Sequence, residues 1–174
     1  MALFPGWQAP DFTTDTTIGP IRFHAWEQGC WRIVMTHPGD YSPHSLRLAL
    51  RQVRSGIVNI HLLGLSPFPM PDQDRDMMVH SGATALADLT DLATVTDDTA
   101  KIMALWQGIA VDAGQDSPPV DMHAAFIVDP ENRIHSTVTY PPATGRDFAE
   151  ILRVLPEPAP LCRPTLEQSA RRAA

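Results

Sequence analysis

Two histidines and a serine lie close together and carry the side chains most able to do chemistry. His37, His44 and Ser45 fall within the segment 37–45, which reads HPGDYSPHS. Histidine titrates near neutral pH and can act as a general acid, a general base or a metal ligand. A serine hydroxyl can act as a nucleophile or as a hydrogen-bond donor to a developing oxyanion. These residues could therefore carry acid–base or nucleophilic chemistry.

A strand and a helix must position these residues. Residues 31–36 have the composition of a buried central strand, which should end at the Pro-Gly pair that follows. Pro43 suits the first turn of a helix, and Gly56 suits its end. Ser45 would then lie at the helix N-terminus. The helix dipole lowers the pKa of a nearby histidine there and favours its neutral, base-competent form.

The rest of the chain alternates strands with helices, which predicts an α/β sandwich. The expected domain covers residues 1–155, and a Pro-rich tail covers 156–174. Within the domain we expect an extended opening segment over 1–22, a short helix over 23–27, a strand over 57–65, a loop over 67–71, helices over 72–80 and 99–107, a hairpin of strands 124–128 and 134–140, and a last helix over 146–155.

Composition limits the classes of function. The chain has 174 residues and a formal net charge of −7, which argues against nucleic acid or an anionic membrane as the main partner. No apolar stretch is long enough to span a bilayer, and the N-terminus does not read as a signal peptide. Cys30 and Cys162 are too few for a secreted disulfide framework. We therefore expect a cytoplasmic protein.

Four segments resemble the peroxiredoxins in the order and spacing of that family. The segment 31–45 keeps the family frame Pro-x-x-x-Thr/Ser-x-x-Cys as Pro38, Ser42 and Ser45. The other segments are 9–24, 95–98 and 140–153. The chain is most similar to the one-cysteine members of the alkyl hydroperoxide reductase/thiol-specific antioxidant group. The resemblance implies a thioredoxin-like fold, with a central mixed β-sheet flanked by helices.

The chain departs from the family at two chemical positions. Ser45 stands where the family has its peroxidatic cysteine, and His123 stands where it has an active-site arginine. A thiolate attacks a peroxide and keeps the transferred oxygen as a sulfenic acid, and a serine oxygen cannot follow that path. The loss of arginine also removes a permanent charge. We therefore predict that the chain is not a thiol peroxidase.

The family fold would gather four catalytic candidates around the former peroxide site. These are Ser45, His123, His44 and His37, and the expected substrate-binding residues are Pro38, Asp40, Tyr41 and Ser42. We expect cofactor-free chemistry of a lyase, isomerase or hydrolase type on a small organic molecule. The alternative is a non-catalytic binding or regulatory role. A divalent metal at His37, His44 and His123 is a weaker alternative, since their spacing matches no local metal signature.

A second possible site involves Cys30. Some animal one-cysteine peroxiredoxins carry a lipase-like site whose serine, histidine and aspartate fall on Cys30, His24 and Glu131 here. Residual antioxidant or acyl-hydrolase activity through these residues is a further alternative. Cys162 is expected to be an incidental thiol of the tail. The resemblance also implies a homodimer, although the C-terminal arm that some members exchange is short after Leu155.

Overall fold

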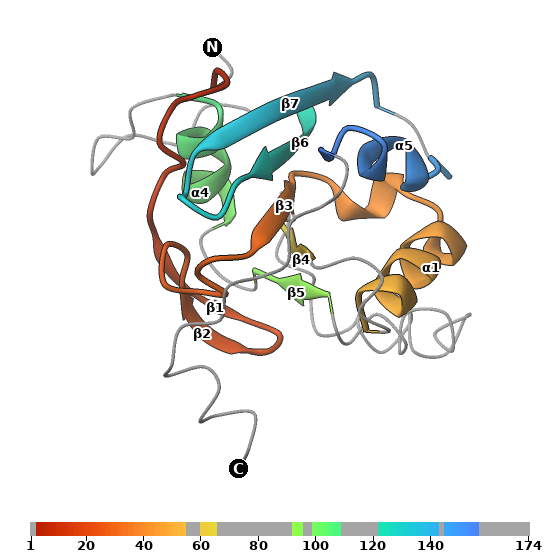
Figure 1. Ribbon diagram of the computed structural model, residues 1–174, viewed down its shortest axis with the longest axis horizontal. Coiled ribbons are helices and arrows are strands. Elements are labelled where there is room, and N and C mark those ends of the chain that lie inside the picture. The colour runs from red at the N-terminus through yellow and green to blue at the C-terminus, as the bar shows by residue number, and fades with distance from the viewer. Residues whose placement is uncertain are drawn as a thin grey trace.

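The computed structural model of the chain describes residues 3–54, 60–65, 92–95, 99–108, 122–142 and 145–156. Five strands form one sheet in the order β5-β4-β3-β6-β7 (Figure 1). They are β3 (Trp31–Met35), β4 (Ile60–Gly64), β5 (Ala93–Thr94), β6 (His123–Val128) and β7 (Ile134–Tyr140). β3 pairs in parallel with β4 and antiparallel with β6, so the sheet is mixed, as expected.

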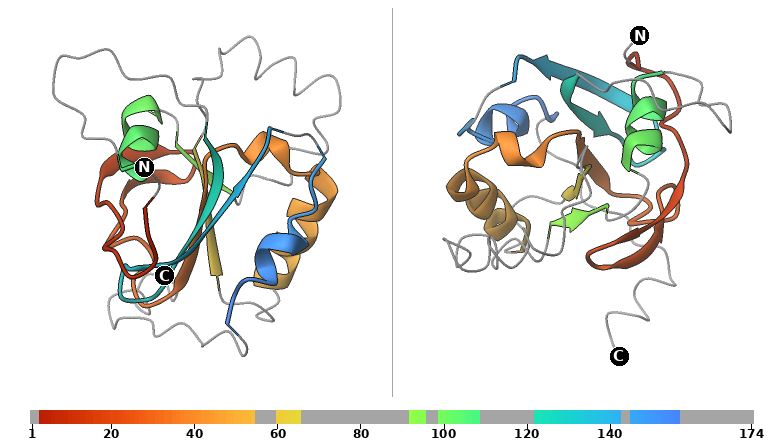
Figure 2. Two further views of the ribbon diagram at one scale, coloured as in Figure 1. Left: turned by 90° about the horizontal axis from the view of Figure 1, so that it is seen from above. Right: turned by 180° about the vertical axis from the view of Figure 1, so that it is seen from behind.

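The two faces of the sheet are covered by different elements (Figure 2). Helices α1 (Pro43–Arg54) and α5 (Ala149–Leu152) lie on one side. Helix α4 (Thr99–Trp106) and the hairpin of β1 (Thr13–Thr16) and β2 (Gly19–Arg22) lie on the other. The expected α/β sandwich is therefore confirmed.

Alternate residues of β3 belong to two separate apolar cores. Val34 packs in a cluster with Trp106 of α4. Ile33 packs in a second cluster with Leu46 of α1 and with Phe148, which precedes α5. Successive side chains of a strand point to opposite faces, so a strand covered on both faces is buried along its whole length, including the charged Arg32 in β3. This explains why all five residues of β3 are buried.

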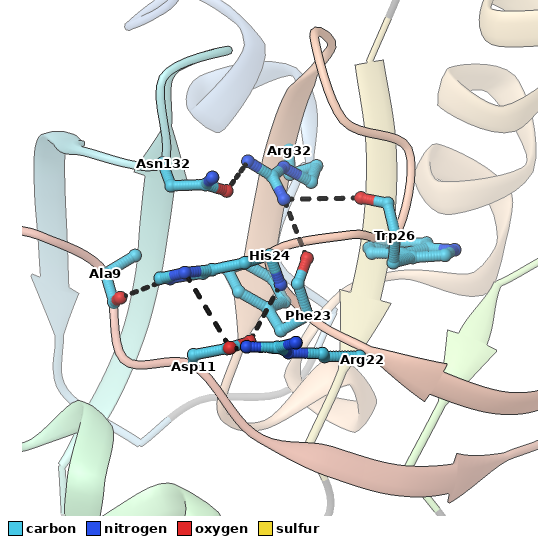
Figure 3. Close-up of polar contacts among 8 residues, drawn as sticks. All are labelled: Ala9, Asp11, Arg22, Phe23, His24, Trp26, Arg32 and Asn132. Carbon is cyan, nitrogen blue, oxygen red and sulfur yellow. Dashed lines mark hydrogen bonds and ion pairs between the residues drawn. The ribbon is translucent and has the colours of Figure 1, made fainter. Parts of the chain in front are cut away.

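The short helix expected over 23–27 is wrong, because this segment forms turns. Glu27 has a φ of 47° and Gly29 has a φ of 83°, both in the left-handed region that interrupts a helix. The guanidinium of the buried Arg32 donates hydrogen bonds to the carbonyls of Phe23 (2.8 Å) and Trp26 (3.3 Å) (Figure 3). Carbonyls held by a core arginine do not need the hydrogen bonds of a helix.

The last helix is shorter than the range 146–155 predicted from the sequence. Helix α5 covers only Ala149–Leu152, because the backbone of Arg146 pairs with another segment. Its N–H donates to the carbonyl of Asp40 (2.9 Å), and its carbonyl accepts from the N–H of Ser42 (2.8 Å). These bonds hold Arg146 in an extended conformation beside the start of α1.

Several other predictions are confirmed. The helix over 99–107 is present as α4, and the hairpin of 124–128 and 134–140 is present as β6 and β7. The predicted helix 72–80, the loop 67–71, Gly56 and the tail after 156 lie outside the described residues. Within the described part of the chain, no helix combines the length and apolar character needed to cross a membrane.

Candidate functional site

The candidate site lies where β3 ends beside the start of β6. Thr36 follows β3, and its hydroxyl accepts a hydrogen bond from the backbone N–H of Ala124 at 2.9 Å. The same hydroxyl lies 2.9 Å from Nδ1 of His37. The chain then makes a short 3-10 helix, η1 (Pro38–Asp40), before α1 begins. Because β3 and β6 are antiparallel neighbours, the end of one and the start of the other place His37 and His123 together.

The η1 turn is packed closely against the end of β4. A Cβ added at Gly64 would lie 3.1 Å from Cγ of Pro38, so a larger residue at position 64 would press on the turn. Pro38 is partly buried in this position. The close packing fixes the segment that carries Asp40.

His123 and Asp40 form a hydrogen-bonded pair. Nδ1 of His123 lies 2.5 Å from Oδ2 of Asp40, and the two side chains are 15% and 13% exposed. A carboxylate that accepts from Nδ1–H fixes the tautomer of the ring and leaves Nε2 as the hydrogen-bond acceptor. The pair therefore presents a histidine whose free nitrogen is ready to accept a proton.

His37 stacks face to face on His123. The ring centroids are 3.6 Å apart, and the planes differ by 9°. Burial lowers the pKa of His37, and the neighbouring His123 lowers it further, while Asp40 acts in the opposite direction. His37 is therefore held in its neutral form near neutral pH, stacked on the ring that the carboxylate of Asp40 orients.

The same three residues could offer atoms to a metal ion, since one ligand atom from each of His37, Asp40 and His123 lies within 4.8 Å of the others. An imidazole binds a metal in the plane of its ring, at about 2.0–2.1 Å for zinc. Two parallel rings 3.6 Å apart direct their lone pairs along parallel planes that do not meet at one ion. The stacked arrangement thus fits proton transfer better than metal binding.

Aromatic residues pack beside the histidine pair. The centroid of the Tyr140 ring lies 6.2 Å from that of His123 and 5.7 Å from that of Tyr41. Phe148 packs edge-on against Tyr41. Burial raises the pKa of both tyrosines, so both stay protonated near neutral pH. The guanidinium of Arg146 covers the Tyr140 ring at 4.4 Å. Sequence reasoning did not select Tyr140 or Arg146, although both lie in the segment 140–153 that carries the family resemblance.

Ser45 is engaged by backbone groups. Its hydroxyl donates to the carbonyl of Ser42 (2.9 Å) and approaches that of Arg146 (3.3 Å). It also accepts the N–H of Phe148 at 3.1 Å. The hydroxyl thus joins the first turn of α1 to the segment that precedes α5.

The structure brings some of the predicted site residues together and separates others. His123 contacts both His37 and Asp40. The ring of Tyr41 packs against that of Tyr140, and the ring of Tyr140 in turn packs against His123. His44 is exposed on the first turn of α1. Asp40 was expected to bind substrate, and in the structure its carboxylate contacts the histidine.

The residues of the possible lipase-like site have other partners. Nε2 of His24 lies 2.7 Å from the carbonyl of Ala9, and Nδ1 lies 3.9 Å from Asp11 (Figure 3). Glu131 is exposed in the hairpin turn. Cys30 is 3% exposed and disulfide-bonded, so in this state it has no thiolate to attack a peroxide or an ester. Cys162 lies outside the described residues.

No family model matches the chain. Peroxiredoxin-6 of Mus musculus is 31% identical over 165 residues, which covers 88% of this chain and 71% of that protein. Peroxiredoxin-6 of Rattus norvegicus is 32% identical with the same coverage.

Solved structures show the same architecture. The yeast mitochondrial 1-Cys peroxiredoxin aligns with a TM-score of 0.62 at 24% identity, over 87% of this chain and 74% of that one. The C45S mutant of the peroxiredoxin 6 of Arenicola marina aligns with a TM-score of 0.59 at 25% identity, over 88% and 72%. These neighbours have the thioredoxin-like fold, which confirms that expectation.

Proposed function

Since the chain belongs to the peroxiredoxin family, we propose that its pocket has exchanged thiol chemistry for acid–base chemistry on a small organic molecule, without a cofactor. The observation that carries the proposal is the 2.5 Å hydrogen bond between His123 and Asp40. In the family frame, His123 takes the position of an arginine. A partly buried histidine oriented by a carboxylate is a suitable general base, whereas an arginine is permanently charged.

The replacement of cysteine by Ser45 supports the first half of the proposal. A serine hydroxyl stays protonated near neutral pH unless a strong base contacts it, and it has no oxidation product equivalent to a sulfenic acid. The hydroxyl of Ser45 is instead engaged by backbone groups of Ser42 and Phe148. It therefore acts as a positioning residue in the proposed pocket.

The histidine pair supports the second half. Nε2 of His123 takes a proton from a C–H or O–H of the substrate, and the imidazolium that forms is stabilised by Asp40. His37 is neutral and stacked on the same ring, so it can act as a second group for proton transfer. Proton abstraction followed by return elsewhere is an isomerisation, and abstraction followed by loss of a leaving group is a lyase reaction. Isomerisation and a lyase reaction both fit the histidine pair better than hydrolysis with Ser45 as nucleophile, because the Ser45 hydroxyl is engaged by backbone groups.

A non-catalytic binding role is the rival function. A binding pocket needs His123 only as a contact, whereas a catalyst needs it to exchange protons with its ligand. A measurement of proton exchange between protein and ligand therefore distinguishes the two roles, whereas a measurement of binding does not.

The test uses small carbonyl compounds with an acidic C–H in heavy water, followed by proton NMR. The native protein should accelerate the replacement of that hydrogen by deuterium for at least one compound of the set. His123→Gln should slow the exchange by about 100-fold or more, which is the lower range of a general base's contribution. Asp40→Ala should slow it as well, because the carboxylate no longer orients the ring.

His135→Gln is the matched control, since His135 is an exposed histidine of β7 outside the pocket. Its exchange rate should equal that of the native protein. Equal rates for native protein and His123→Gln would contradict the acid–base role. Binding of a compound to the pocket without accelerated exchange would favour the binding role instead.

A further inference from the structure

A second cluster of metal-binding side chains lies at the opposite end of β3 from His37. It comprises Glu27, Cys30 and His61, and one ligand atom from each lies within 4.8 Å of the others. We propose that this cluster binds a zinc ion when Cys30 is in its reduced thiol form. The inference does not rest on the acid–base role proposed for His123.

The backbone between Glu27 and Cys30 has the shape of a chelating turn. The N–H of Cys30 donates to the carbonyl of Glu27 at 3.1 Å, which closes the turn. Glu27 (φ 47°) and Gly29 (φ 83°) both adopt left-handed conformations. Two residues separate the ligands, as in the Cys-x-x-Cys pairs of structural zinc sites. A non-glycine residue with positive φ is uncommon, and here it carries one of the ligands.

The third ligand comes from the neighbouring strand. His61 of β4 is the register partner of Arg32 in β3, so it lies close to the point where Cys30 leads into that strand. Nε2 of His61 lies 3.5 Å from Oε2 of Glu27. The ring of Trp26 packs edge-on against the His61 ring, with 6.0 Å between centroids. The tryptophan limits the orientations that the imidazole can adopt.

The chemistry of the three side chains favours zinc. A thiolate, an imidazole and a carboxylate are all zinc ligands, and three protein ligands leave one tetrahedral position for water. The same residues could form a nucleophilic set for acyl transfer. However, Cys30 is only 3% exposed, and an ester or amide must approach the sulfur directly. A single ion, which can coordinate a buried sulfur, is the better fit.

The oxidation state of Cys30 controls the proposed site. The cysteine is disulfide-bonded in this structure, and a disulfide sulfur is not the thiolate that zinc requires. A cellular dithiol would break the S–S bond with two electrons and become a disulfide itself. The released Cys30 thiol then loses its proton to solvent as the zinc–sulfur bond forms. Metal binding and the disulfide thus exclude each other.

Cobalt(II) is the probe, because it occupies zinc sites and has visible spectra. The full chain is reduced with a phosphine, which does not compete for metal as dithiols do, and is titrated with cobalt. We expect one ion per chain, d–d bands of a tetrahedral site and a near-ultraviolet thiolate charge-transfer band, all lost on addition of zinc. His61→Gln and Cys30→Ser should each weaken binding by about 100-fold or more, since even an outer-shell partner contributes 10- to 100-fold.

One further variant and one control on the native protein locate the site. His123→Gln should bind cobalt as the native protein does, because His123 belongs to the other end of β3. The native protein should not bind cobalt before reduction, because the sulfur of Cys30 is then held in a disulfide. The proposal is overturned if the thiolate band is absent, if His61→Gln with a native circular dichroism spectrum binds with unchanged affinity, or if His123→Gln abolishes binding. A thiolate band that appears in the native protein before reduction would overturn control by the disulfide.

Discussion

At the scale of single residues, the resemblance to the peroxiredoxins predicts two exchanged side chains that would change the available chemistry. We expect Ser45 to take the position of a cysteine in the family frame, and His123 that of an arginine. Each change removes a requirement of thiol chemistry: the sulfur that accepts oxygen, or the permanent cation that stabilises a thiolate. Asp40 gives the histidine a partner at 2.5 Å, which supports a new role for the same pocket.

The first prediction at this scale concerns hydroperoxide reduction. The native protein, assayed with excess dithiothreitol, should not consume hydroperoxide faster than dithiothreitol alone, because Ser45 cannot form a sulfenic acid. The disappearance of peroxide over time is the measurement. Rapid consumption that survives replacement of both Cys30 and Cys162 would show that this interpretation of Ser45 is wrong.

Two variants provide the comparison for this assay. Ser45→Cys should react slowly, since the arginine that stabilises the thiolate is missing. The double variant Ser45→Cys/His123→Arg should react faster, by about threefold for each unit by which the restored charge lowers the thiol pKa, because a larger thiolate fraction is partly offset by a weaker nucleophile. Equal rates for the single and double variants would show that position 123 does not control the thiolate.

At the scale of elements, the pocket depends on the joint between α1 and the segment before α5. Three backbone N–H groups donate hydrogen bonds there: that of Arg146 to the Asp40 carbonyl, that of Ser42 to the Arg146 carbonyl, and that of Phe148 to the Ser45 hydroxyl. The joint holds Asp40 against His123. The hydroxyl of Ser45 forms its described hydrogen bonds with backbone groups and not with the histidine rings. Ser45 therefore contributes to the geometry of the site through this joint.

A stability measurement tests this joint. Ser45→Ala should lower the free energy of unfolding by about 1–3 kcal/mol, because the buried N–H of Phe148 loses its acceptor. Urea unfolding followed by circular dichroism is the measurement. Ser136→Ala is the matched control, since the Ser136 hydroxyl is buried and makes no hydrogen bond within the described residues. If Ser45→Ala lowers the free energy of unfolding no more than Ser136→Ala does, the structural role of Ser45 is contradicted.

At the scale of the whole molecule, the mixed sheet separates two apolar cores and places one candidate site at each end of β3. The cluster of His37, Asp40 and His123 lies where β3 ends, and the cluster of Glu27, Cys30 and His61 lies where it begins. Arg32, at the start of β3, is fully buried and donates to carbonyls of the opening segment and to Asn132 of the hairpin turn (Figure 3). This single side chain ties distant parts of the chain to the sheet.

We propose that the whole molecule is a homodimer, as the resemblance to the peroxiredoxins implies. Light scattering coupled to size-exclusion chromatography should give about twice the chain mass of 19.1 kDa. A mass of one chain at every concentration would contradict the proposal. The cytoplasmic location inferred from composition likewise stays a prediction.

The sequence by itself determined the family, the order of most elements and the position of the unusual serine. These features depend on local patterns: the apolar run of β3, the proline that begins α1 and the spacing of Pro38, Ser42 and Ser45. Only the tertiary structure decided that Asp40 pairs with His123, 83 residues away, and that His61 lies beside Glu27 and Cys30. It also decided that residues 23–27 form turns, because a buried arginine satisfies their carbonyls. Such contacts depend on side chains brought together by folding, and no short stretch of sequence encodes them.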